Sequence, residues 1–177
     1  MNNSRFISVI SLMTSISFVL MLFEIPIIPG YAFLTYDPSD VIPLMTGLYA
    51  GIWYSIIIIA LRNILHFLIK PDLLGHIMSF VASIAFVIPT ILIYRNNHTK
   101  KGGILGLLCG IIFLSISMYI LNYIVVPIFY GMHGKQLYAY LLYGVIPFNI
   151  LKGFINSIVV LFFYKRFSGL FLKNIKK

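Results

Sequence analysis

The 177-residue chain is 60% hydrophobic and only 10% charged, with a mean hydropathy of +1.01. These values exclude a soluble globular domain, in which about a quarter of residues are charged, and they indicate an all-α integral membrane protein. The formal charge of +9 would suggest nucleic acid as a partner of a soluble protein. Here the basic residues flank apolar segments, as orientation signals do, so we expect lipid and no nucleic acid.

The length accommodates about six membrane spans with short connections and leaves no room for an additional soluble domain. We therefore expect a single transmembrane domain over residues 1–177. Its helices are predicted at approximately 6–23, 39–49, 52–69, 73–94, 103–126 and 143–164.

The first predicted helix, 6–23, is followed by Glu24 and two prolines. A signal peptide would have a shorter apolar region and a cleavage pattern of small residues, so we expect a retained helix. Ser11 and Ser15 give it a small-xxx-small face, which lets another helix approach closely within lipid.

Residues 24–39 are too rich in proline to continue a helix and too apolar for an ordinary solvated loop, which is typical of a lid. At the end of this segment Asp37 is placed as an N-cap, Pro38 as the first helical residue and Asp40 in the first turn. This capping role is favoured over ligand contact for both aspartates.

Residues 41–68 are longer than one span needs and contain Pro43, Gly47 and Gly51. They form either two helices divided near residue 50 or one bent helix. Arg62 and His66 share a helical face. Because His66 has no second ligand at metal-binding spacing, we expect a hydrogen-bonded structural histidine and no metal site.

The distribution of basic residues predicts the orientation in the membrane. With six spans, only Lys70 and Lys135 lie outside, whereas nine basic residues share the other side: Arg5, Arg95, Lys100, Lys101, Lys165, Arg166, Lys173, Lys176 and Lys177. This asymmetry predicts a multi-pass protein of the cell membrane with both termini in the cytoplasm. Five spans give a weaker split, and only six bring loops 24–39 and 129–140 to the same outer half.

The last predicted helix, 143–164, carries polar side chains where a membrane helix is usually apolar. Asn149, Lys152 and Asn156 fall on one face. A lysine inside the hydrocarbon layer is costly, so it should face protein, a ligand or a water-filled cavity. We interpret this face as part of a binding pocket. The alternative is that Lys152 snorkels to the interface or pairs with an acid for structural reasons.

The polar residues of the last two spans suggest the class of ligand. Asn122 and Asn149 each offer a donor and an acceptor, and with Lys152 they can satisfy a flat heterocycle that alternates carbonyl and N–H groups. Nearby aromatic residues provide stacking surfaces for such a ring. This chemistry does not by itself select one vitamin among several.

Motifs for catalysis and for energy coupling are missing from the sequence. It has no G-x-x-x-x-G-K-[ST] loop, no H-E-x-x-H and no G-x-S-x-G, so we expect neither an enzyme nor a cofactor. An ion-coupled carrier would usually be longer and furnished with intramembrane acids. A small binding unit without its own energy source would need partner subunits.

Four sequence segments resemble those of a known family. They are LTYDPSDVIPLMTGLYAG (34–51), LRNILH (61–66), LNYIVVPIFYGM (121–132) and GVIPFNILKG (144–153). Over nearly its whole length the chain resembles the riboflavin-specific substrate-binding subunits, or S components, of energy-coupling-factor (ECF) transporters. The resemblance implies a six-transmembrane-helix S-component bundle that captures riboflavin, as a transported ligand, from outside. It also implies a transmembrane coupling subunit and two cytoplasmic ATPase subunits as partners, and reorientation in the membrane to release the vitamin inside.

The resemblance also assigns roles to individual residues. Asn122, Asn149 and Lys152 match positions that contact the isoalloxazine ring in that family. The loop before the second helix, with Leu34, Tyr36 and Asp40, is implied to cap and wall the site. Ser11 and Ser15 stand where these subunits often carry an alanine-xxx-alanine surface for docking to the coupling subunit.

Two alternatives remain open at the level of sequence. Beside the riboflavin-binding S component that the resemblance implies, these alternatives are an S component for another heterocyclic vitamin and a non-transporting scaffold subunit whose polar residues only hold helices together.

Overall fold

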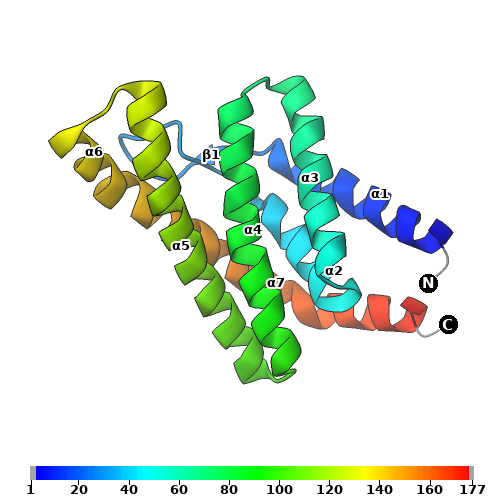
Figure 1. Ribbon diagram of the computed structural model, residues 1–177. Coiled ribbons are helices and arrows are strands. Elements are labelled where there is room, and N and C mark those ends of the chain that lie inside the picture. Colours follow the sequence, from blue (N-terminus) through cyan, green and yellow to red (C-terminus); the bar gives the residue numbers. More distant parts are fainter. Residues whose placement is uncertain (1–2, 176–177) are drawn as a thin grey trace.

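The computed structural model describes residues 3–175 (Figure 1). In chain order the elements are α1 (Asn3–Met21), β1 (Ile25–Pro26), β2 (Thr35–Tyr36), the 3-10 helix η1 (Pro38–Asp40), α2 (Val41–Ala50), α3 (Ile52–Ile69), α4 (Leu73–Asn96), α5 (Lys100–Tyr130), α6 (Gly134–Tyr140), the π-helical segment η2 (Leu141–Val145) and α7 (Ile146–Ile175).

Because α6, η2 and α7 follow one another without a break, the described residues form six helices, which confirms the predicted all-α, six-helix bundle. Four of them are long and apolar enough to cross a membrane: α3, α4, α5 and the continuous helix Gly134–Phe163. The apolar part of α1 is shorter, and α2 has 10 residues.

The segment 41–68 contains two helices rather than one bent helix. Gly51 ends α2 and precedes α3 with φ at 115°, a backbone conformation that other residues rarely adopt. The later helices extend beyond the predicted boundaries. Thr99 caps α5 by accepting a hydrogen bond from the Gly102 N–H (3.0 Å), and α5 continues through Pro127 until Gly131 takes the left-handed conformation.

The connection between α1 and α2 folds back as a short antiparallel pair, in which Ile25 lies opposite Tyr36. Its turn packs against α6 through aromatic rings, because Tyr31 and Phe33 lie 5.6 and 5.8 Å from the ring of Tyr140. This contact holds the connection at the end of the bundle where α5 meets α6. It is the segment for which the sequence predicts a lid.

Helices α4 and α5 lie side by side along most of their length (Figure 1). Small residues permit this approach. A Cβ atom added at Gly106 would lie 2.8 Å from the backbone oxygen of Thr90, and one added at Gly110 would lie 2.7 Å from that of Phe86. Within lipid, close backbone contact of this kind supplies much of the helix association energy.

Replacing Gly110 with alanine is therefore expected to lower the free energy of unfolding by about 1 to 3 kcal/mol, because a methyl group does not fit against the backbone of α4. Thermal unfolding in detergent measures the change. Gly103→Ala is the matched control, since its Cβ would lie 3.6 Å from the Tyr94 ring, an ordinary contact. Equal thermal stability of the two variants would contradict the role of Gly110.

Candidate functional site

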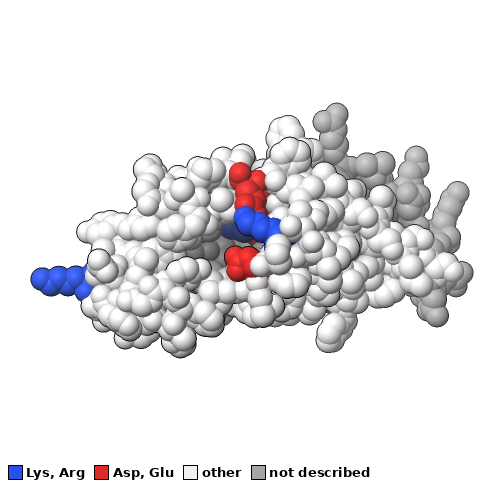
Figure 2. Space-filling view, turned by 90° about the horizontal axis from the view of Figure 1, so that it is seen from above, with Lys and Arg blue, Asp and Glu red and all other residues white. Residues whose placement is uncertain are grey.

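A cavity of about 460 Å³ lies at the end of the bundle that carries the α3–α4 and α5–α6 connections. Seen from that end, acidic and basic side chains gather around a hollow (Figure 2). The lining comes from the end of α1, the α1–α2 connection, α3, the α3–α4 connection, α4, α5, the α5–α6 connection and the continuous α6–α7 helix. A site assembled from so many segments can enclose a small molecule on several sides.

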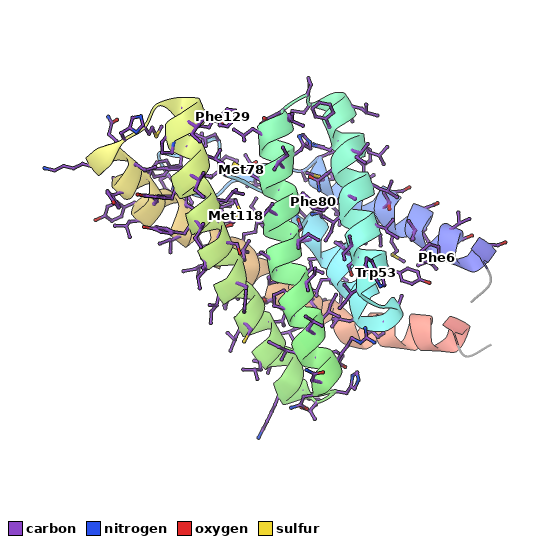
Figure 3. All side chains as sticks on the ribbon, viewed as in Figure 1. Phe6, Trp53, Met78, Phe80, Met118 and Phe129 are labelled. Carbon is purple, nitrogen blue, oxygen red and sulfur yellow. The ribbon has the colours of Figure 1, made fainter. Side chains whose placement is uncertain are left out.

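One part of the cavity is apolar. Met78 projects from α4 and Met118 from α5 (Figure 3), and Ala82, Val126 and Phe148 add to the same lining. Methionine side chains are flexible and polarizable, so they adapt well to the faces of aromatic ligands. This wall suits a flat, largely apolar ring.

Two asparagine amides enter the cavity from α5 and α7. Asn122 donates through Nδ2 to the Met118 carbonyl (2.8 Å), and its Oδ1 accepts a hydrogen bond from the Tyr140 hydroxyl (3.1 Å). Asn149 donates through Nδ2 to the carbonyl of Val145 (2.8 Å), the last residue of the π-helical segment. Each amide nitrogen has a second N–H, and the Oδ1 atom of Asn149 has no partner among the described residues. Both side chains are almost fully buried, so their unused groups are available to a ligand in the cavity.

Lys152 lies one turn beyond Asn149 and is paired with two acids. Its Nζ is 3.3 Å from Asp37 Oδ2 and 3.4 Å from Asp40 Oδ2, and 5% of the residue is exposed. The lysine therefore neither snorkels to the interface nor lacks a countercharge. It lines the cavity together with Asp37, so ion pairing and a place in the pocket are compatible for this residue.

Arg62 is the other buried cation, and it is fully enclosed. Its Nη2 lies 2.5 Å from Asp40 Oδ1 and donates to the Ser83 hydroxyl (2.6 Å), while Nη1 donates to the hydroxyls of Ser17 (3.3 Å) and Ser39 (2.5 Å). These contacts join α1, η1, α3 and α4. The positive charges of Arg62 and Lys152 are thus balanced by the negative charges of Asp37 and Asp40.

The two aspartates differ in what they do. Asp37 caps η1, because its carboxylate accepts from the Ser39 N–H (3.1 Å) and from the Ser39 hydroxyl. Asp40 makes no side-chain capping bond to α2. Burial would raise the pKa of Asp40, but the charges of Lys152 and Arg62 outweigh that effect and lower it. Asp37 is thus the N-cap and Asp40 lies in the first turn of η1, as the sequence predicts, and Asp40 also serves as a countercharge.

The structure brings together four of the six residues expected to contact a ligand. Asn122, Asn149, Lys152 and Leu34 line the cavity, and their contact with a ligand stays a prediction. Tyr36 and Asp40 lie behind that lining. Burial raises the pKa of Tyr36 to about 12, and its protonated hydroxyl donates to Asn156 Oδ1 (3.0 Å).

The outer rim of the cavity holds charged and titratable residues that the sequence did not single out as a group. Lys70 donates to Glu24 Oε2 (2.6 Å), which ties the end of α3 to the start of the α1–α2 connection. His66 of α3 and His76 of α4 are hydrogen-bonded at 2.9 Å. The expectation of a hydrogen-bonded histidine at position 66 is met, and its partner His76 lies 10 residues further on, across the α3–α4 connection.

The two serines expected to dock on a partner lie away from the cavity. Ser11 and Ser15 are both exposed on α1, and the Ser15 hydroxyl donates to the backbone oxygen of Ser11 (2.9 Å). That internal bond satisfies the hydroxyl of Ser15 without a partner subunit. The Ser15 hydroxyl therefore stays hydrogen-bonded when a close-packing helix covers this face.

The fold and cavity are those of a membrane protein that binds a small molecule, and comparison with known proteins identifies its family. Residues 5–164 match the family described as "ECF transporter, substrate-specific component". The chain belongs to this family, which confirms the predicted S-component class. It is a transporter subunit of the membrane and not an enzyme.

Individual relatives agree with this assignment. The chain is 36% identical to "Riboflavin transporter RibU" of Staphylococcus aureus, covering 98% of this chain and 94% of the relative. It is 31% identical to "Riboflavin transporter FmnP" of Bacillus subtilis, covering 93% and 89%. A solved structure titled "Structure and mechanism of the S component of a bacterial ECF transporter" superposes with a TM-score of 0.85 at 33% identity, over 96% of this chain and 98% of that one.

Proposed function

We propose that this chain is the riboflavin-binding S component of an ECF vitamin importer. The observation that carries the proposal is the convergence of Asn122, Asn149 and Lys152 on one partly apolar cavity, in a chain whose relatives are named riboflavin transporters. The isoalloxazine ring of riboflavin has a flat apolar end and a polar end with alternating carbonyl and N–H groups. Amides that keep a donor and an acceptor free suit the polar end, and the methionine-lined wall suits the apolar one.

The charge balance of the site favours a neutral ligand. Lys152 already faces two carboxylates, so an incoming molecule need not supply a countercharge. An uncharged ring that accepts a hydrogen bond from the ammonium group fits this arrangement.

The partners follow from the family. An S component with no ATP-binding loop in its sequence would associate with a transmembrane coupling subunit and two cytoplasmic ATPase subunits, which supply the energy for import. The exposed Ser11 and Ser15 face of α1 is our candidate for docking to the coupling subunit, because small residues permit close helix approach in lipid.

The proposed orientation places both termini in the cytoplasm of a cell-membrane protein. Six helices put the two ends of the chain on the same side. Basic residues at the adjoining ends of α4 and α5 (Arg95, Lys100 and Lys101) and from Lys165 to the C-terminus mark that side as cytoplasmic. The cavity then opens toward the outside, where the vitamin is captured.

A competition experiment tests the choice of ligand. Purified protein loaded with riboflavin is challenged with excess thiamine, biotin or unlabelled riboflavin, and the release of bound flavin is followed by fluorescence. We expect only riboflavin to displace the bound flavin. Displacement by another vitamin would favour an S component for that solute, and failure to load at all would favour a scaffold role.

A further inference from the structure

A second polar feature of the cavity lies on its α3–α4 side. His66 is 4% exposed and lines the cavity, as do His76 and Glu24. His66 Nδ1 lies 2.9 Å from His76 Nε2, and His76 Nδ1 lies 2.5 Å from the backbone oxygen of Asp72. The proposed contacts of a flavin ring with Asn122, Asn149 and Lys152 give this pair of hydrogen-bonded histidines no role.

The hydrogen bonds fix which nitrogen carries each proton in the uncharged pair. The Asp72 carbonyl can only accept, so His76 Nδ1 carries a hydrogen and His76 Nε2 is an acceptor. His66 Nδ1 must then donate to His76 Nε2. This leaves His66 Nε2 with a lone pair and no hydrogen.

A carboxylate near that lone pair is also an acceptor. Glu24 Oε1 lies 4.0 Å from His66 Nε2, while the other carboxylate oxygen of Glu24 is held by Lys70 Nζ at 2.6 Å. Two acceptors at this spacing cannot bond to each other. A molecule that presents hydroxyl donors would satisfy both, because each hydroxyl gives one hydrogen.

We propose that His66 Nε2 and Glu24 Oε1 form a subsite for adjacent hydroxyl groups of the ligand. The subsite rests on the proposed function, and it assigns an orientation to the bound flavin. The ring lies toward Asn122, Asn149 and Lys152, and the ribityl chain lies toward α3 and α4. His66 is then a determinant of specificity for a flavin that carries a polyol.

The test compares riboflavin with lumiflavin, which has the same ring system but a methyl group in place of the ribityl chain. Affinities are measured by fluorescence titration of the detergent-solubilised full chain. We expect the unmodified protein to bind riboflavin about 5- to 30-fold more tightly than lumiflavin, the range for one or two buried hydrogen bonds. His66→Phe should weaken riboflavin binding by a similar factor and change lumiflavin binding less than about twofold.

Two further variants complete the test. His66→Gln returns an acceptor near the position of Nε2 and should recover part of the riboflavin affinity. His98→Phe, on the exposed connection between α4 and α5, is the control and should change neither affinity.

Equal affinity of the unmodified protein for riboflavin and lumiflavin would overturn the subsite. This outcome does not depend on whether His66→Phe folds, and it would leave the proposed riboflavin binding standing. Equal weakening of both ligands by His66→Phe would also overturn it. Binding of neither flavin by the unmodified protein would overturn the proposed function itself.

Discussion

Replacing Arg62 with methionine is expected to lower the free energy of unfolding by about 3 to 5 kcal/mol. Arg62 is fully buried, and its removal leaves Asp40 without its closest countercharge and Ser83 and Ser39 without a donor. The three buried charges that remain, those of Lys152, Asp37 and Asp40, would then sum to −1 rather than zero. Thermal unfolding of the purified protein in detergent measures the effect as a large fall in Tm.

A second substitution separates charge imbalance from lost packing. In the double variant Arg62→Met, Asp40→Asn, the remaining pair of Lys152 and Asp37 is neutral, so we expect part of the lost stability to return. Arg95→Met, near the exposed end of α4, is the control and should change Tm little. A Tm of the Arg62→Met variant close to that of the unmodified protein would contradict the structural role of this network.

Replacing Asn149 with alanine is expected to weaken riboflavin binding about 10- to 100-fold, because the ligand loses a buried hydrogen-bonding partner. Asn149 lines the cavity, and its Oδ1 has no partner within the described part of the chain, so the loss should fall on the ligand more than on the fold. The dissociation constant from a fluorescence titration gives the magnitude.

Asn63 provides a matched control for this prediction. Its Nδ2 donates to the backbone oxygen four residues earlier at 2.8 Å, the same bond that Asn149 makes, but Asn63 lies on α3 outside the cavity lining. Asn63→Ala should therefore leave riboflavin affinity within about twofold, since it removes no ligand contact. If Asn149→Ala also changes affinity less than twofold, Asn149 does not contact the flavin.

Local spacing was sufficient to predict the polar face of the last helix. Residues three apart share a helical face, so the alignment of Asn149 with Lys152 could be inferred without a structure. The hydrophobic lengths left residues 41–68 open between two helices and one bent helix, and the choice of six spans depended on the asymmetry of the basic residues and on bringing both loops to the same outer half. The polar face, in contrast, depends on spacing within one or two turns of the chain.

Partners distant in sequence could not be predicted in the same way. Asp37 lies 115 residues before Lys152, and the pair forms only because η1 packs beside α7. The same holds for Arg62 with Asp40, which are 22 residues apart. His66 and His76 are only 10 residues apart, but they meet because α3 and α4 pack together across their connection. A sequence with only four acids does offer a hint, because each buried cation has few candidates for a countercharge.

An equilibrium titration of the purified chain with riboflavin tests the central claim most directly. The flavin ring, held among Asn122, Asn149 and the methionine-lined wall, should lose its fluorescence on binding. We predict saturable quenching that ends at one riboflavin per chain. Unquenched flavin fluorescence at stoichiometric and excess protein would contradict the account.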